Sequence, residues 1–234
     1  MTRFIVAPEV FSALPGVCFG TLVVKNIDNN LPQPEISAIL KEVQQELFQK
    51  LNGRKAKEYP PILPYREAFQ ALSINPNKYP PSIEALTARV EKGKELPSIN
   101  PAVDLGNAIS LKYGIPLGAH DLDSSAEDLY VRLSDPSDCF IPFGETEPET
   151  PDPSEILYVS GHQVKTRRWI WRQSEFGKVT AESKNLFFPL DGFEPINGEA
   201  TKIARDELAK LLEKYFHTPP IVGWVNQENP IFEF

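Results

Sequence analysis

The stretch PSINPAVDLGNAISLKYGIPLGAHDLD, residues 97–123, carries the most information about how this chain folds. Pro101 suits the first turn of a helix, where its missing N–H is not needed. Gly114 and Pro116 follow Tyr113, and both residue types are typical of the end of a helix. The segment therefore predicts a short amphipathic helix from Pro101 to Tyr113 that leads directly into a strand.

Polar residues of this helix and strand predict a pocket. Asp104 and Asn107 are three residues apart and so share one face of the helix. The strand brings His120, Asp121 and Asp123 close to its end. If the asparagine points from the helix towards the His and Asp residues at the strand end, these side chains together line a polar pocket. The alternative is that Asp104 and Asn107 only tie the helix to a neighbouring loop, and for Asp104 we favour a buried, hydrogen-bonded structural role.

These residues resemble the editing domain of the phenylalanyl-tRNA synthetase beta chain. In that family a helix carrying valine, aspartate, a turn residue and asparagine leads through a Gly-x-Pro pair into a strand that ends in alanine, an aromatic residue and aspartate. The corresponding residues here are Val103, Asp104, Gly106, Asn107, Gly114, Pro116, Ala119 and Asp121. The resemblance extends to free-standing relatives of the domain through YREAFQALSINPNKYPPSIEALTARVEKGKELPSINP from Tyr65, RRWIWRQ from Arg167 and VTAESKNLFFPLDGF from Val179. Together these blocks cover roughly residues 60–193.

The chain departs from the synthetase pattern at the residues nearest to the expected chemistry. Gly118 stands where the family has a histidine, and His120 stands where it has an aromatic residue. Gly106 replaces a threonine beside the asparagine. Because side chains two positions apart on a strand share a face, we expect His120 to recover part of the function of the missing imidazole.

The resemblance implies an aminoacyl-tRNA deacylase that acts in trans, an editing hydrolase of translation quality control. It would hydrolyse the ester between a wrong amino acid and the terminal adenosine of tRNA. That ester is already activated, so the protein need only position water and stabilise the oxyanion. Asn107 would orient the substrate and His120 would position water or act as general base. Asp121 would hold the histidine or accept a hydrogen bond from the amino group of the substrate.

Two other functions stay open. The first is a non-catalytic module that binds tRNA or an amino acid through the same pocket, which the glycine at position 118 favours. The second is a diverged small-molecule hydrolase. The sequence shows no synthetase catalytic core, so aminoacylation by this chain alone is not expected.

A cationic, tryptophan-containing segment predicts the contact with tRNA. Four of the eight residues from Lys165 to Arg172 are Lys or Arg, and two are Trp. If residues 163–173 form one strand, alternation places Arg167, Trp169, Trp171 and Gln173 on one face and Arg168, Ile170 and Arg172 on the other. We expect Arg167, Arg168 and Arg172 to meet the phosphates of the acceptor end, and Trp169, Trp171 and Gln173 to contact a base or the amino-acid moiety. The alternative places the tryptophans in the core and the arginines at its rim.

Composition limits the partners. The formal net charge of the 234 residues is −8, which argues against a general nucleic-acid coat protein. We therefore expect tRNA binding to be weak and salt-dependent, with no DNA partner. No apolar run approaches the roughly 18 residues that a membrane span needs, and the first residues do not resemble a signal peptide, so we expect a cytoplasmic protein without a membrane partner. Cys18 and Cys139 are isolated and the three histidines lack ligand spacing, so we expect no metal and no cofactor.

The hydrophobic patterning predicts a single α+β domain over residues 1–234. We expect strands over 16–25, 155–160, 163–173, 185–190 and 221–225, the last at a sheet edge, and further helices over 36–51, 65–72, 82–92 (capped by Ser82) and 198–216. The pair 155–160 and 163–173 reads as a hairpin around Gly161 and His162. Helices and strands mix without strict βαβ alternation, and hairpins imply antiparallel pairing, which together favour mixed or antiparallel sheets packed with helices.

Overall fold

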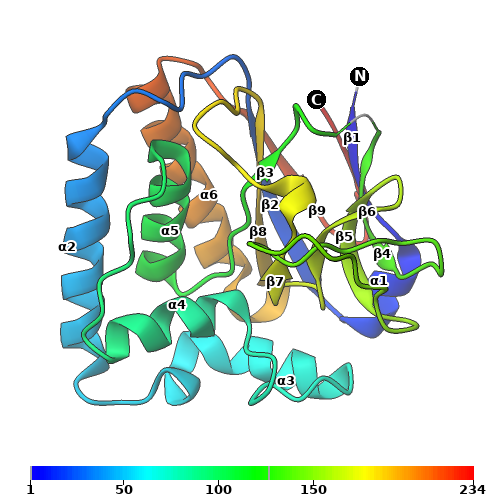
Figure 1. Ribbon diagram of the computed structural model, residues 1–234. Coiled ribbons are helices and arrows are strands. Elements are labelled where there is room, and N and C mark those ends of the chain that lie inside the picture. The colour runs from blue at the N-terminus through cyan, green and yellow to red at the C-terminus, as the bar shows by residue number, and fades with distance from the viewer. Residues whose placement is uncertain (1, 126) are drawn as a thin grey trace.

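Two β-sheets form the framework of this computed structural model, which describes residues 2–125 and 127–234 (Figure 1). One sheet has the order β10-β1-β4-β5-β6-β7 and is antiparallel except where β1 and β4 run parallel. Its strands are β1 (Arg3–Val6), β4 (Leu129–Leu133), β5 (Ile156–Ser160), β6 (Gln163–Arg167), β7 (Arg172–Gln173) and β10 (Ile231–Glu233). The other is antiparallel, in the order β3-β8-β2-β9, and contains β2 (Val17–Val24), β3 (His120–Asp121), β8 (Leu186–Phe193) and β9 (Ile221–Val225). The fold is α+β with mixed and antiparallel sheets, as the sequence predicts.

Helices cover one side of the four-stranded sheet. The α-helices are α1 (Pro8–Ala13), α2 (Pro34–Leu51), α3 (Leu63–Ala71), α4 (Ser82–Glu91), α5 (Pro101–Tyr113) and α6 (Glu194–Phe216), and the short 3₁₀ turns are η1 (Ala56–Glu58), η2 (Pro60–Ile62) and η3 (Glu175–Gly177). Figure 1 shows α2, α5 and α6 side by side next to β2 and β8, while α3 and α4 lie below them. No helix in the described part of the chain is long and apolar enough to cross a membrane.

The four-stranded sheet is the middle layer of the molecule. On one side, aromatic rings from both sheets pack together: Phe4 of β1 lies 4.9 Å from Phe187 of β8 and 5.7 Å from Phe19 of β2, centroid to centroid. On the other side, Phe188 of β8 belongs to the core made with α5 and α6. Every residue of β2 and β8 is buried. Coverage on both faces explains why these strands are apolar along most of their length, with Thr21 in β2 and Asp191 in β8 as polar exceptions, rather than alternating.

The sequence places most elements within a few residues of their observed limits, but the strand expected over residues 163–173 is wrong. The backbone turns at Arg168 and Trp169, where φ is 47° and 58°, so β6 ends at Arg167 and β7 begins at Arg172. The alternation of faces predicted for this segment therefore does not hold beyond Arg167. Ser82 is also not a cap: it is the first residue of α4, after the N-cap Pro81, and no side-chain hydrogen bond caps this helix.

Candidate functional site

Helix α5 and the loop after it build one wall of the site. The Asn100 side chain accepts a hydrogen bond from the Val103 N–H (3.0 Å) and caps the helix. Gly114 ends it with φ 67°, and a Cβ atom there would lie 2.5 Å from Pro61 Cβ, so only glycine fits. The loop then binds β8 through two backbone hydrogen bonds of 3.0 Å, Gly118 N–H to Pro189 O and Asp191 N–H to Pro116 O.

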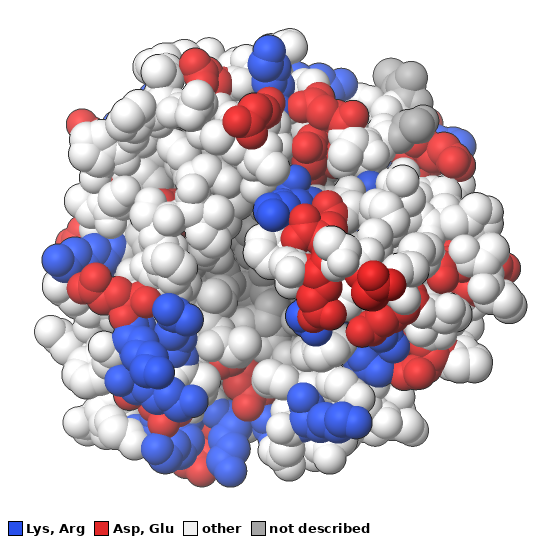
Figure 2. Space-filling view, viewed as in Figure 1, with Lys and Arg blue, Asp and Glu red and all other residues white. Residues whose placement is uncertain are grey.

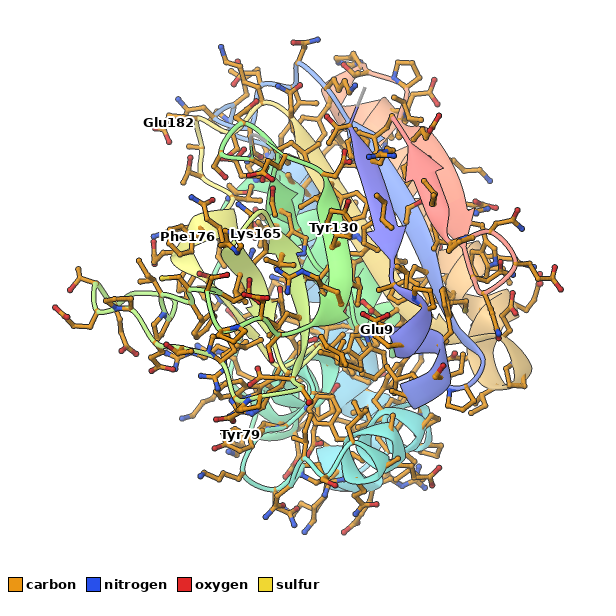
Figure 3. The ribbon with its side chains drawn as sticks, turned by 90° about the vertical axis from the view of Figure 1, so that its right-hand side faces the viewer. Glu9, Tyr79, Tyr130, Lys165, Phe176 and Glu182 are labelled. Carbon is orange, nitrogen blue, oxygen red and sulfur yellow. The ribbon has the colours of Figure 1, made fainter. Side chains whose placement is uncertain are left out.

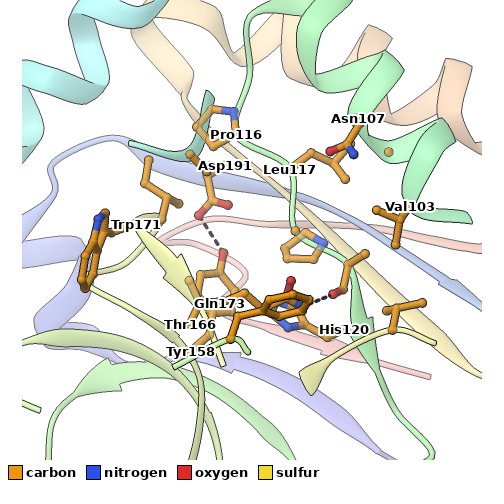
Figure 4. A pocket seen from close by; sticks show the side chains of 18 of the residues that line it. Val103, Asn107, Pro116, Leu117, His120, Tyr158, Thr166, Trp171, Gln173 and Asp191 are labelled. Carbon is orange, nitrogen blue, oxygen red and sulfur yellow. Dashed lines mark hydrogen bonds between the residues drawn. The ribbon is translucent and has the colours of Figure 1, made fainter. Parts of the chain in front are cut away.

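A pocket of about 180 Å³ lies between this wall, the segment around β7, and β8 (Figure 4). Its lining is mostly apolar and aromatic, with a few polar groups, and includes Val103, Asn107, Gly118, His120, Tyr158, Thr166, Trp169, Trp171, Gln173 and Asp191. A cavity of about 150 Å³ is enough to hold a benzene ring. The pocket therefore has room for a group of the size of an amino-acid side chain. The face seen in Figure 2 is hollowed beside α5; the inside of the hollow is mostly uncharged, while Lys, Arg, Asp and Glu side chains lie along its right-hand rim.

Asp191 is the acidic group of this pocket, and none of the sequence motifs above contains it as a candidate site residue. Among the described lining residues it alone has a carboxyl group, and none is Lys or Arg. Its Oδ1 accepts hydrogen bonds from the Tyr158 hydroxyl (2.6 Å; Figure 4) and from Trp169 Nε1 (2.7 Å), so neither of these hydrogen bonds uses Oδ2. Burial raises the pKa of Asp191 to about 7, although both hydrogen bonds act to lower it. An acidic residue inside the apolar run of β8 is the signal that could have identified it.

His120 lines the pocket but is held as an aromatic ring. It is 2% exposed and stacks between Tyr158 (centroids 5.6 Å apart, planes at 25°) and Phe187 (6.3 Å, 23°). Its Nδ1 has no hydrogen-bond partner within the part of the chain that the structure describes. A Cβ atom at Gly118 would lie 3.0 Å from Nε2, and one at Gly177 would lie 3.2 Å from Nδ1, so glycines make room for both edges of the ring.

The surroundings of His120 keep it neutral. Burial, and secondly the positive charge of Lys165, lower the pKa of the imidazole to about 3. Lys165 is buried on β6, and its Nζ donates to the Phe176 carbonyl (2.8 Å; Figure 3). Burial also lowers the pKa of Lys165, to about 8. A base with a pKa near 3 is poorly matched to proton transfer at neutral pH, so this geometry argues against His120 as general base.

Asn107, Asp121 and Asp104, the other candidate polar residues of the segment 97–123, differ in their surroundings. Asn107 is part-exposed and lines the same pocket as His120. Asp121 is not among the lining residues, because its carboxylate accepts hydrogen bonds from Ser183 Oγ (2.8 Å) and the Asp123 N–H (2.7 Å). These hydrogen bonds join Asp121 to Asp123 and Ser183, and none among the described residues joins it to His120. Asp104 is buried and accepts hydrogen bonds from the Ile99 N–H and Ser98 Oγ, which confirms its structural role.

The arginines expected to contact tRNA are paired with acids. Arg167 is 5% exposed and forms ion pairs with Glu155 (2.9 Å), Glu149 (2.8 Å) and Asp152 (3.4 Å). Arg168 is also buried and pairs with Asp152 (2.7 Å). The more exposed Arg172 pairs with Glu145 (3.0 Å). The acidic stretch 143–155 thus neutralises this cluster, and the burial of Arg167 and Arg168 argues against phosphate contacts by either.

The neighbouring Trp and Gln residues divide between core and pocket. Trp169 is fully buried and joins the core between the sheets, although one side of it borders the pocket. Trp171 lines the pocket and lies under the guanidinium carbon of Arg168, 4.7 Å from the ring centroid. Gln173 also lines the pocket. Its Nε2 donates hydrogen bonds to the Ala119 carbonyl (2.7 Å) and the Gly177 carbonyl (3.1 Å), which hold the side chain in place.

Comparisons with known proteins agree with this architecture. Residues 64–217 match the family model of the B3/4 domain. This chain belongs to the B3/4 domain family. The family occurs in the phenylalanyl-tRNA synthetase beta subunit, and this chain is a relative of that domain.

A solved structure shows the same fold. The B3/4 chain is similar to an N-terminal fragment of the phenylalanyl-tRNA synthetase beta-subunit from Pyrococcus horikoshii, with a TM-score of 0.52 and 12% sequence identity over 95% of this chain and 54% of that one. It therefore spans about half the length of that fragment. No curated protein matches the chain. Within residues 2–125 and 127–234, no three His, Cys, Asp or Glu side chains are grouped as a metal site requires.

Proposed function

We propose that this B3/4 domain hydrolyses the ester of mischarged aminoacyl-tRNA in trans, with the amino-acid moiety bound in the pocket beside α5. The observation that carries the proposal is a pocket of amino-acid size that is lined by one buried carboxyl group, that of Asp191. Apolar and aromatic walls with a few convergent polar groups are typical of small-molecule sites. The relation to the synthetase beta subunit supports an ester of tRNA as the source of the amino acid.

Asp191 is the group best suited to activate water in this pocket. In the proposed reaction its carboxylate takes a proton from water while the water oxygen bonds to the ester carbonyl carbon. The bond from that carbon to the ribose oxygen then breaks, and the proton passes to the ribose oxygen. A general base works best when its pKa is near the working pH, and the pKa of Asp191 is about 7. Asn107 would orient the substrate through its side-chain amide.

A non-catalytic binding module is the second candidate. The observation that favours it is the state of His120, which is neutral, buried and stacked rather than poised for proton transfer. In that case the pocket would bind an amino acid or an aminoacyl-tRNA without hydrolysing it. The two candidates differ only in whether the ester is cleaved.

The test is to incubate the protein with a panel of tRNAs, each charged with a labelled amino acid, and to follow release of the label. Asp191→Asn keeps the shape and the hydrogen-bond acceptor but removes the base, so we expect deacylation to fall by about 10²–10⁴-fold. Asp121→Asn is the matched control, because Asp121 lies outside the pocket lining, and it should stay within a few-fold of the parent. A parent that binds aminoacyl-tRNA and deacylates none of the panel would establish the binding module instead.

A further inference from the structure

A basic surface lies where α2 and α4 end. Residues 50–58 and 89–95 contain seven cationic residues, all exposed, and three acidic residues, Glu58, Glu91 and Glu95; the cations are Lys50, Arg54, Lys55, Lys57, Arg89, Lys92 and Lys94. We call these two segments the basic surface. Figure 2 shows Lys and Arg gathered on this lower part of the face, below the hollow. The chain as a whole has a net charge of −8, so this local excess of positive charge is opposite in sign to the charge of the whole protein.

The two segments form one continuous surface. Lys55 Nζ lies 2.8 Å from Glu91 Oε1, and the Ala56 N–H donates to Glu91 Oε2 (2.9 Å), so the chain after α2 is joined to the end of α4. No ion pair among the described residues involves Arg54, Lys57, Lys92 or Lys94. These charges are therefore available to a ligand, in contrast to the paired arginines 167, 168 and 172.

Helix stabilisation explains only part of this charge. Cations in the last turn of a helix interact favourably with its dipole, and Lys50 in α2 and Arg89 in α4 hold such positions. The unpaired cations lie after the last residue of either helix. Phe48, in the last turn of α2, is 52% exposed. Exposed aromatic rings beside cations are typical of surfaces that bind RNA, because bases stack on the rings while cations meet phosphates.

The position of α4 connects the basic surface to the pocket. Ser82, the first residue of α4, lines the pocket, and Glu91, the last residue, belongs to the basic surface. The ten residues of this helix span about 15 Å. A polyanion attached to a group in the pocket would therefore reach the basic surface along one short helix.

We propose that the basic surface binds the phosphate backbone of an RNA whose aminoacylated end enters the pocket. The inference rests on the proposed function for the identity of the RNA, but its test measures binding rather than hydrolysis. Arg54, Lys57, Lys92 and Lys94 are the residues expected to meet phosphates, and Phe48 the residue expected to stack on a base.

The experiment measures the affinity of the whole protein for uncharged tRNA by fluorescence anisotropy at a series of salt concentrations. One variant changes Arg54, Lys57, Lys92 and Lys94 to Gln. The matched control changes Lys25, Lys202, Lys210 and Lys214 to Gln, which alters the net charge equally at exposed sites elsewhere. Each phosphate contact contributes about 0.7–0.9 to the slope of log affinity against log salt, so four lost contacts should reduce the slope by about 3.

Weaker binding and a smaller slope for the basic-surface variant, with parent-like binding by the control, would support the proposal. An equal loss of affinity in both variants would show that only net charge matters, and no loss of affinity in either would place the RNA elsewhere on the protein. Each of these results overturns the proposal. A parent protein that binds no tRNA at low salt overturns it as well. Melting temperatures of both variants verify that they fold. Hydrolysis of amino-acid methyl esters, which are too small to reach the basic surface, should be unchanged in the variant, and this readout tests the proposed function separately.

Discussion

Replacing Asp191 by Asn should make the stability of the domain less dependent on pH. The fold holds Asp191 in a buried site, and this burial raises its pKa from 3.8 to about 7. Between pH 3.8 and about pH 7, the Asp191 carboxyl group therefore keeps its proton in the folded state, whereas in the unfolded chain it has lost it. The stability that this proton contributes is fully present below pH 3.8 and is lost progressively as the pH rises to about 7. The asparagine of the Asp191→Asn variant would present the same acceptor oxygen to Tyr158 and Trp169 without this penalty.

The size of the effect follows from the two pKa values. Each tenfold change in a proton equilibrium corresponds to about 1.4 kcal/mol. Between pH 5 and pH 8 the unfolded carboxyl is ionised throughout, while the folded carboxyl goes from protonated to ionised. The parent should thus lose about 2–3 kcal/mol of unfolding free energy over this range through Asp191. The advantage of the Asp191→Asn variant over the parent should grow by the same amount.

Urea unfolding of both proteins at pH 5, 6, 7 and 8 measures this difference. The titratable groups packed around Asp191 do not change charge in that range: burial raises the pKa of Tyr65 and of Tyr158 far above it, raises that of Cys18 to about 12, and helps to lower that of His120 to about 3. Changes elsewhere in the protein cancel between parent and variant. A stability difference that stays constant from pH 5 to pH 8 would refute the reasoning, because it would mean that Asp191 ionises as freely in the fold as in the unfolded chain.

Two further predictions concern the polar residues on the other walls of the pocket. Asn107→Ala should raise the apparent Michaelis constant for deacylation by about 2–10-fold, the worth of one hydrogen bond, with little change in turnover; a loss confined to turnover would contradict an orienting role. His120→Phe should fold and keep at least a tenth of the activity, because the ring stacks between Tyr158 and Phe187 and one of its nitrogens lacks a partner among the described residues. A melting temperature lower by more than about 4 °C, roughly 1 kcal/mol in a domain of this size, would show that the imidazole nitrogens matter to the fold.

Local signals explain why much of the fold is predictable. Pro101 and Gly114 delimit α5, since one needs no N–H and the other adopts a left-handed backbone that would be strained for other residues. The helical spacing of apolar residues likewise identifies α2 and α6 to within a few residues. The structural role of Asp104 is predictable for the same reason: a carboxylate in the first turn of a helix readily bonds to nearby backbone N–H groups.

Distant contacts explain where the sequence misleads. Nothing local marks the turn at Arg168 and Trp169, whose left-handed backbone is stabilised by contacts from elsewhere. The Trp169 N–H donates to the Ile156 carbonyl (2.6 Å) and its indole to Asp191, while the Arg168 N–H donates to Glu155 (2.8 Å). The prediction that alternate side chains lie on opposite faces assumes a continuous strand. It fails where such contacts turn the backbone.

The same limit applies to the chemistry of the pocket. The family pattern places a histidine at Gly118, and in the sequence the nearest imidazole, that of His120, is the natural substitute. In the structure His120 instead takes the role of the aromatic residue whose position it occupies, and the space at Gly118 accommodates its ring. The group with a pKa suited to neutral pH comes from β8, about 70 residues later in the chain, and is brought into the pocket by the backbone bond between Asp191 and Pro116. If catalysis in this domain depends on an acid–base group, strand pairing has moved that role from the α5 motif to β8, and substitution of Asp191 rather than His120 is the decisive experiment.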